Sequence, residues 1–276
     1  MAAPTSPTPL DHSASGYSHT HAYWLAEAAR AAYKSPAEAE SLARDWGFDR
    51  FRHFSSPHTM PFPIDDTQAY VAASDRMIVV AFRGTEPTNL RDWLSDVNTP
   101  PVPGPAGRGF VHYGFHRALD VVHPQVRDTV GEFKDDGQTV WFTGHSLGGA
   151  LAMLSGARMH FEAPKLVPHG VYTYGQPRTC DRLLATAYDE ALKGRTFRFV
   201  NNNDIVPQVP PAPAFHHVDA VRYFDATGTL HDRMPTLSLL ADKVKGATAD
   251  PFAPASDGIR DHFIDAYVNL LAKNTG

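Results

Sequence analysis

The sequence lacks the features that accompany disulfide-stabilised, membrane-spanning and nucleic-acid-binding proteins. Cys180 is the one cysteine among 276 residues, so no disulfide can form within the chain. No apolar run approaches the ~20 residues of a membrane-spanning helix, and no membrane span is expected. The net charge is -5 and no basic cluster accompanies it, which argues against nucleic acid as a partner.

Signatures of bound metals and phosphates are also missing. None of the 15 histidines falls in the H-E-x-x-H spacing of a zinc site. No lysine follows the glycines of residues 144–149, as a phosphate-binding P-loop requires. We therefore expect no metal and no cofactor. Cys180 is not expected to act as a nucleophile, because nothing near it in the sequence would lower the pKa of its thiol.

The N-terminal residues are rich in Pro, Ser and Thr and contain neither the basic start nor the apolar core of a secretory signal. We expect residues 1–16 to form a flexible leader. No linker or shift in composition divides residues 17–276, which we expect to form a single domain. Without a signal in the sequence, a cytoplasmic location is favoured, with secretion as the alternative if a signal has been removed.

Patterns typical of strands and helices alternate along the chain. Helices are predicted over residues 19–33, 35–46, 115–122, 124–133, 147–161, 181–192 and 261–273. Strands are predicted over residues 69–74, 77–82, 139–143, 170–174 and 196–200, and a hairpin over 220–231. This order predicts an α/β fold with a mostly parallel central sheet flanked by helices on both faces. Its working residues should follow the carboxyl ends of the strands.

Residues 139–161 combine a strand, a sharp turn and a helix with the pattern Gly-x-Ser-x-Gly. Gly144 and Gly148 flank Ser146, and residues without a Cβ let the backbone turn tightly enough to present the serine hydroxyl. The helix that follows would direct its first N–H groups toward negative charge developing at Ser146, which makes Leu147 a candidate oxyanion donor. The pattern predicts a nucleophilic serine, and a glycine-rich turn without chemistry is the alternative.

A serine nucleophile needs a histidine to accept its proton and a carboxylate to orient that histidine. In one common chain order, the acid and then the histidine follow the serine. Asp204 follows a predicted strand, where a loop can aim its carboxylate at Ser146. Asp181 fits worse as a predicted helix cap, and Asp189 as a residue on a helix surface. An Asn-rich turn without chemistry is the alternative for Asp204.

Four histidines follow Asp204, namely His216, His217, His231 and His262. His262 stands where the last helix is predicted to begin. The positive end of a helix dipole disfavours the imidazolium form, which suits a base that rests neutral. We therefore predict His262 as the base. His217 precedes a strand, and a structural hydrogen bond is the expectation for it.

The segment that follows the buried strand at residues 77–82 is the expected source of a second oxyanion donor. Thr85 offers both a backbone N–H and a hydroxyl, and Gly84 allows close approach of the backbone. The alternative is a plain turn at the end of the strand.

Several motifs, taken in order, resemble the class 3 or fungal-type lipases of the α/β-hydrolase superfamily. The matching pieces are Phe82-Arg83-Gly84-Thr85, Asp92-Trp93-Leu94-Ser95-Asp96, Val111-His112-Tyr113-Gly114-Phe115, Gly144-His145-Ser146-Leu147-Gly148-Gly149, Tyr174-Gly175-Gln176-Pro177-Arg178, Asn203-Asp204-Ile205-Val206-Pro207 and Asp261-His262. The resemblance implies an α/β-hydrolase fold and hydrolysis of carboxylic esters. It implies Ser146 as nucleophile, Asp204 and His262 as its partners, and Thr85 with Leu147 as the oxyanion hole.

The resemblance also implies that Asp96 steadies the Thr85 hydroxyl. Two features depart from the family pattern. Cys180 stands close to where members often carry glycine, and the paired cysteines of secreted fungal members are missing.

Leu90, Trp93, Leu94 and Val97 fall at the spacing of one helix face. In the family this segment is the lid, whose apolar face covers the site in water and binds a lipid surface when the lid opens. A permanently docked helix with its stripe in the core is the alternative.

Together these features predict a serine carboxylic ester hydrolase that acts on acyl lipids through an acyl-enzyme on Ser146, with triacylglycerol lipase as the first expectation. Phospholipase A1, monoacylglycerol lipase and feruloyl-type esterase use the same catalytic triad, and these activities stay open as alternatives. From a different class, some lipase-like proteins are interaction modules without catalysis. The expected partners are an acyl-ester lipid and, transiently, a lipid–water interface.

Overall fold

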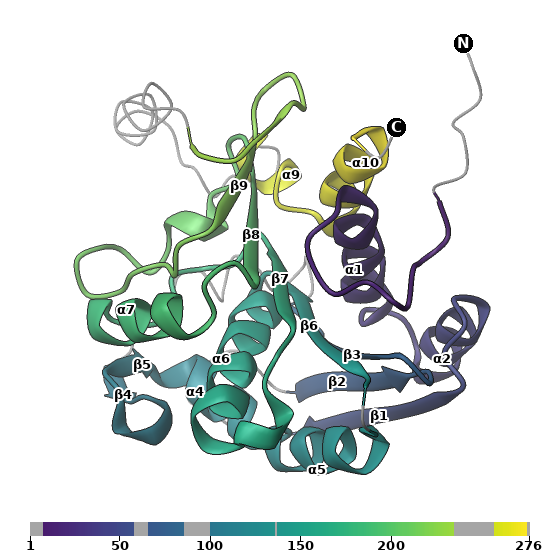
Figure 1. Ribbon diagram of the computed structural model, residues 1–276. Helices are drawn as coiled ribbons and strands as arrows, with labels where there is room; N and C mark the ends of the chain where they lie inside the picture. Colours follow the sequence, from purple (N-terminus) through teal and green to yellow (C-terminus); the bar gives the residue numbers. More distant parts are fainter. Residues whose placement is uncertain (1–7, 58–65, 86–99, 136, 235–256, 275–276) are drawn as a thin grey trace.

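The computed structural model describes residues 8–57, 66–85, 100–135, 137–234 and 257–274. Eight strands form one sheet in the order β1-β2-β3-β6-β7-β8-β9-β10 (Figure 1). They are β1 (Arg50–Pro57), β2 (Asp66–Ala73), β3 (Met77–Phe82), β6 (Thr139–His145), β7 (Gly170–Tyr174), β8 (Thr196–Asn201), β9 (Val221–Phe224) and β10 (Leu230–His231). The strands from β3 to β9 are parallel, and the pairs at both ends are antiparallel. The predicted α/β fold with a mostly parallel sheet is confirmed.

Helices cover both faces of this sheet (Figure 1). On one face lie α1 (His19–Ala31), α2 (Pro36–Asp45) and α10 (Ile264–Lys273), and on the other lie α4 (Tyr113–Asp120), α5 (His123–Phe133), α6 (Leu147–Glu162) and α7 (Arg182–Ala191). The strand β3 shows why its sequence is continuously apolar. Val79 packs in the cluster with α1, whereas Ile78 and Val80 pack in the cluster with α6.

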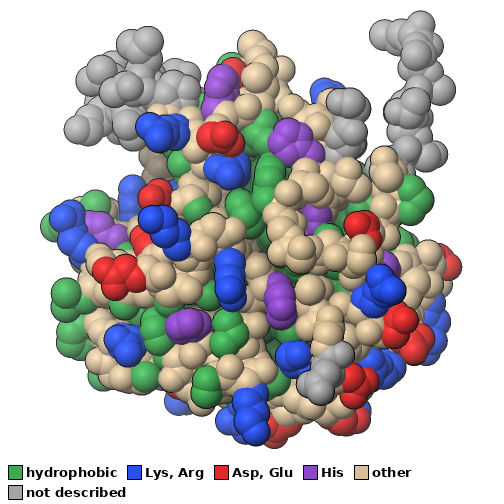
Figure 2. Space-filling view, in the orientation of Figure 1, with side chains coloured by type: hydrophobic (Ala, Val, Ile, Leu, Met, Phe, Trp, Pro, Cys, Tyr) green, Lys and Arg blue, Asp and Glu red, His purple; other side chains and the backbone are tan. Residues whose placement is uncertain are grey.

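Shorter elements complete the described part of the chain. The strands β4 (Pro101–Pro103) and β5 (Phe110–His112) pair with each other, and α9 (Asp257–Arg260) precedes α10. None of the helices in the described ranges has the length and apolar character needed to cross a membrane. On the face shown in Figure 2, acidic and basic side chains of the described residues are interspersed.

Four elements differ from the sequence expectations. β1 is not predicted because it is an edge strand with a polar sequence, in which Phe54 is the one buried residue. β4 and β5 are too short for a periodic pattern to reveal them. The last helix begins at Ile264 instead of Asp261, so His262 lies in the turn before it. This turn, and not the helix itself, carries the predicted base.

Part of the expected leader contacts the rest of the chain. His12 Nδ1 lies 2.7 Å from the Ser74 hydroxyl, and His12 Nε2 lies 2.8 Å from the Trp46 carbonyl oxygen. Leu10 packs against the buried cluster on the α1 face, while residues 1–7 lie outside the described residues. The continuous sheet supports our proposal that residues 17–276 form one domain.

Buried His21 leads to a prediction about pH and stability. Its ring centroid lies 4.2 Å from that of Trp141, and burial lowers its pKa from 6.5 to about 4. Below pH 6.5 the unfolded chain protonates His21 while the folded chain does not, so the stabilisation present above pH 6.5 is lost on acidification. Between pH 6.5 and 4, the free energy of unfolding should fall by roughly 3 kcal/mol on account of this group.

His21→Phe keeps an aromatic ring beside Trp141 but cannot titrate. Urea unfolding at a series of pH values measures the free energy of unfolding. Below pH 6.5, this free energy should therefore fall less steeply for the variant than for the wild type. A decline as steep as that of the wild type would contradict the assignment of this pH dependence to His21.

Candidate active site

The Gly-x-Ser-x-Gly pattern folds as a strained turn between β6 and α6. Ser146 has φ 58° and ψ -128°, a region of positive φ that residues with a Cβ rarely adopt. A Cβ at Gly144 would collide with the backbone of Gly148, and a Cβ at Gly148 would collide with the carbonyl of Phe82. The two glycines therefore permit the turn, and the next residue, Leu147, begins α6.

Hydrogen bonds bring Ser146, His262 and Asp204 together. His262 Nε2 lies 2.8 Å from Ser146 Oγ, and His262 Nδ1 lies 2.9 and 3.0 Å from the two carboxylate oxygens of Asp204. None of the three residues is more than 2% exposed. Because an ionised carboxylate only accepts, Nδ1 carries the proton of the neutral imidazole. Nε2 is then free to accept the proton of the serine hydroxyl.

The buried carboxylate of Asp204 has two further donors. The Val206 backbone N–H donates to Oδ1 at 2.9 Å, and the Tyr267 hydroxyl donates to Oδ2 at 2.6 Å. Burial, followed by the charge of Asp204, raises the pKa of Tyr267 well above its usual value, so the hydroxyl keeps its proton. Tyr267 is not among the residues predicted from the sequence, where it occupies one apolar position of the last helix.

The two expected oxyanion donors lie on neighbouring elements. Thr85 follows β3, Ser146 follows β6, and these strands are parallel neighbours that end at the same sheet edge. As the first residue of α6, Leu147 has a backbone N–H without an acceptor inside the helix. Thr85 Oγ1 is buried and has no hydrogen-bond partner among the described residues. Asp96 lies outside the described residues, as do Leu90, Trp93, Leu94 and Val97 of the predicted lid.

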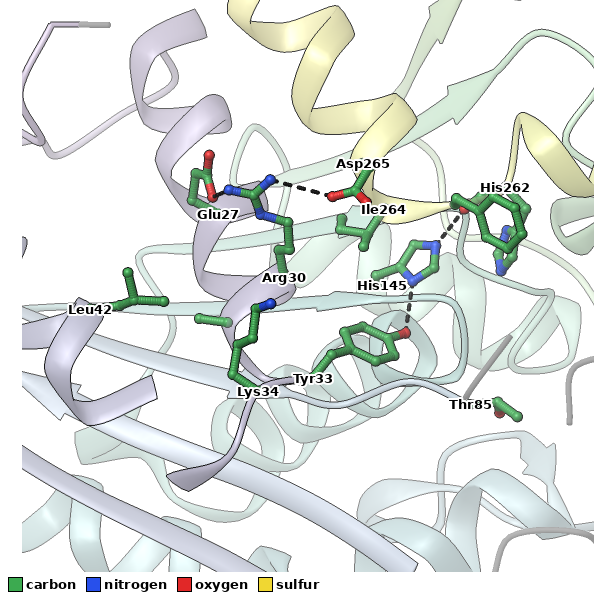
Figure 3. A pocket seen from close by; sticks show the side chains of 12 residues that line it. Glu27, Arg30, Tyr33, Lys34, Leu42, Thr85, His145, His262, Ile264 and Asp265 are labelled. Carbon is green, nitrogen blue, oxygen red and sulfur yellow. Dashed lines mark hydrogen bonds and ion pairs between the residues drawn. The ribbon is translucent and has the colours of Figure 1, made fainter. Parts of the chain in front are cut away.

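A cavity of about 750 Å³, called the site cavity below, adjoins these residues (Figure 3). Thr85 and His262 line it together with residues from the end of α1 and the start of α10. Arg30 lies on its wall and pairs with Glu27 at 2.6 Å and with Asp265 at 3.3 Å. The lining thus combines charged and apolar groups, and it can accommodate a polar part of a ligand beside His262.

The other acids considered from the sequence have structural contacts elsewhere. The Asp181 side chain accepts from the Leu184 backbone N–H at 2.9 Å, so the predicted helix cap is confirmed. The Asp189 side chain accepts from the Asp219 backbone N–H at 2.9 Å. Neither carboxylate takes part in the hydrogen bonds at His262.

The other candidate bases, His216, His217 and His231, and Cys180 take no part in the hydrogen bonds that join Ser146, His262 and Asp204. His217 Nε2 lies 2.6 Å from the Pro207 carbonyl oxygen, which is the kind of structural bond expected for it. His231 pairs with an aspartate of the β9–β10 hairpin, and the His216 backbone N–H donates to the Cys180 carbonyl. Cys180 is buried, and burial raises the pKa of its thiol. Within the described ranges, no three His, Cys, Asp or Glu side chains form a group suited to a metal ion.

Comparisons with known proteins find similarity to lipases. The model of the family described as lipase (class 3) matches residues 79–214. A lipase of Rhizomucor miehei is 37% identical over 156 residues, which cover 54% of this chain and 42% of that protein. The secreted mono- and diacylglycerol lipase 1 of Fusarium solani is 34% identical over 149 residues, covering 52% of this chain and 43% of that protein. The matches span less than half the length of these two relatives.

A solved structure is similar over a larger share of the chain. The structure of the Rhizomucor miehei triacylglyceride lipase superimposes with a TM-score of 0.59 at 28% identity. The superposition covers 75% of this chain and 80% of that chain. The likeness therefore extends beyond the segment matched by the family model.

Tyr267→Phe tests how far the buried carboxylate depends on its tyrosine donor. The variant keeps the ring but removes the donor to the buried carboxylate and the acceptor of the Asn201 backbone N–H, so the free energy of unfolding should fall by about 1–3 kcal/mol. Chemical denaturation at pH 7 measures this difference. Tyr188→Phe is the matched control, because its buried hydroxyl pairs at 3.2 Å with the neutral Thr196 hydroxyl. A smaller decrease in the free energy of unfolding for Tyr267→Phe than for Tyr188→Phe would contradict the role given to Tyr267.

Proposed function

The chain belongs to the class 3 lipases, and on this premise we propose that it is a serine carboxylic ester hydrolase acting on acyl lipids, in the first place a triacylglycerol lipase. One observation carries the proposal. Ser146 Oγ, the imidazole of His262 and the Asp204 carboxylate form a continuous hydrogen-bonded chain with separations of 2.8 and 2.9 Å. That order of groups is what activation of a serine hydroxyl requires.

The proposed reaction begins with attack of Ser146 on the ester carbonyl carbon. Its hydroxyl proton passes to His262 Nε2, and the Asp204 carboxylate stabilises the imidazolium that results. When the tetrahedral intermediate collapses, the bond to the alcohol oxygen breaks and His262 returns its proton to that oxygen. Water then loses a proton to His262 and attacks the carbonyl carbon of the acyl-enzyme. The bond between that carbon and Ser146 Oγ breaks, His262 returns its proton to Oγ, and the fatty acid leaves.

Charge that develops on the carbonyl oxygen needs donors that are already in place. The backbone N–H of Leu147 at the start of α6 is the first proposed donor, and the positive end of that helix adds to its effect. Thr85 is the second proposed donor, through its backbone N–H and its buried hydroxyl. Both belong to backbone segments held by the central sheet, so they would need little rearrangement during the reaction.

The lining of the site cavity favours one alternative substrate in particular. Because His262 protonates the departing alcohol, the alcohol part of the ester must lie beside it. The cavity next to His262 carries the charged residues Arg30 and Lys34, which suit a polar alcohol such as glycerol. Monoacylglycerol lipase activity is therefore the second candidate, and relative rates on mono- and triacylglycerols of one acyl chain distinguish the two.

The proposal also covers where the protein acts and its contact with a lipid–water interface. The relative from Fusarium solani is named as secreted, so we propose secretion instead of the cytoplasmic location favoured from the sequence. A transient contact with a lipid–water interface is proposed from the apolar spacing of residues 90–97. A jump in rate as an ester substrate passes its solubility limit would support this contact, and a smooth curve through the limit would speak against it.

Ser146→Ala tests the proposed nucleophile. The kcat for a soluble p-nitrophenyl ester should fall by roughly 10³- to 10⁶-fold, because the group that forms the acyl-enzyme is gone. The melting temperature should stay close to that of the wild type. Ser155→Ala serves as control, since it removes a buried hydroxyl from α6, the helix that follows Ser146, and should retain activity. Full activity in Ser146→Ala would overturn the assignment.

A further inference from the structure

His145 lies at the centre of the site but has no part in the proposed reaction steps. It is the residue between Gly144 and Ser146, it is 4% exposed, and it faces the site cavity (Figure 3). Its Nε2 lies 2.6 Å from the backbone carbonyl oxygen of His262, and its Nδ1 lies 2.8 Å from the Tyr33 hydroxyl. Both contacts are drawn as dashed lines in Figure 3.

The chemistry of the partners fixes the direction of these hydrogen bonds. A carbonyl oxygen can only accept, so His145 Nε2 carries a proton. Burial, followed by the charge of neighbouring His262, lowers the pKa of His145 well below its usual value, so the ring is neutral and Nδ1 is an acceptor. The Tyr33 hydroxyl must therefore donate to His145, and His145 donates to His262.

Neutrality of His145 matters because its ring lies close to the proposed base. The ring centroids of His145 and His262 are 4.6 Å apart. A positive charge on His145 would oppose the imidazolium that forms on His262 during acyl transfer. His145 can thus hold the His262 backbone without adding a charge next to its ring.

The backbone of His262 depends on this support because it lies between helices. His262 stands in the turn that joins α9 to α10, where its N–H donates to the Ile259 carbonyl at 3.2 Å. Its carbonyl oxygen accepts a hydrogen bond from the side chain of His145, the last residue of β6 and the neighbour of the nucleophile in the sequence. The neighbour of Ser146 in the sequence therefore helps to hold the His262 imidazole in position relative to the serine hydroxyl.

Tyr33 links His145 to Gly84, the residue before the proposed oxyanion donor Thr85. A Cβ at Gly84 would collide with the Tyr33 hydroxyl, so the two groups are in close contact just before Thr85. Burial raises the pKa of Tyr33, while the charge of Arg83 and the Gly84 backbone amide act in the opposite direction. The hydroxyl thus lies between the Gly84 backbone on one side and His145 on the other.

We propose that Tyr33 and His145 are positioning residues that hold the base, the nucleophile turn and the oxyanion segment at fixed separations. The inference rests on the proposed function, since it assigns these residues a task in ester hydrolysis. Neither side chain exchanges a proton with the substrate. Their contribution comes from keeping His262 and Thr85 aligned on the same reacting carbonyl group.

Tyr33→Phe is the direct test because it keeps the ring and removes the donor to His145. The kcat for a p-nitrophenyl ester should fall by roughly 10-fold, and KM should change by less than about twofold, because alignment during the reaction is lost while binding is kept. Tyr23→Phe is the matched control. It removes a tyrosine hydroxyl of α1 that bonds Glu27 at 2.7 Å, away from His145, and it should leave kcat unchanged.

A second pair of variants keeps the test informative if Tyr33→Phe folds poorly. His145→Gln retains an N–H donor for the His262 carbonyl and should keep more of kcat than His145→Leu, which has no donor. Equal kcat in Tyr33→Phe and Tyr23→Phe, or in His145→Gln and His145→Leu, would overturn the positioning role while leaving the proposed function intact. A wild-type protein without esterase activity would overturn both.

Discussion

The hydrogen bonds between His262 and the buried carboxylate of Asp204 are the interaction on which the rest of the site depends. A charged carboxylate that is 2% exposed is stable in the interior only when donors surround it. His262, Val206 and Tyr267 supply those donors, and they come from three separate segments of the chain. Fixing the carboxylate therefore also fixes the ring that faces Ser146.

The packing of α1 against the sheet explains how these segments meet. Buried side chains of the parallel strands bond the helix backbone, with Thr143 Oγ1 donating to the Leu25 carbonyl at 2.8 Å and the Tyr174 hydroxyl donating to the Ala22 carbonyl at 2.5 Å. α10 lies beside α1 on the same face (Figure 1). The turn that carries His262 and the turn after α1 that carries Tyr33 therefore lie over the same strand ends as the Ser146 turn.

Local patterns predict most of this architecture, whereas long-range contacts are beyond them. The spacing of glycines around Ser146 predicts the nucleophile, and the structure shows that a Cβ at either glycine would collide with the backbone. Asp204 is predicted from its place after a strand. His262 is chosen by its position at the predicted start of the last helix, although that helix begins later than expected. Tyr267 and Tyr33 have no such local signal, because their hydroxyls find partners 63 and 112 positions away in the sequence. Their roles depend on how the helices pack, which periodicity does not encode.

Covalent labelling by a p-nitrophenyl phosphonate tests the central claim most directly, because the reagent reacts with a serine only when a neighbouring base activates it. Attack by the serine oxygen forms a bond to phosphorus and releases p-nitrophenolate, which can be counted as it forms. The account predicts one label per chain, located by peptide mass on Ser146, and none after denaturation. Failure of the native protein to react, or a label on a residue other than Ser146, would contradict it.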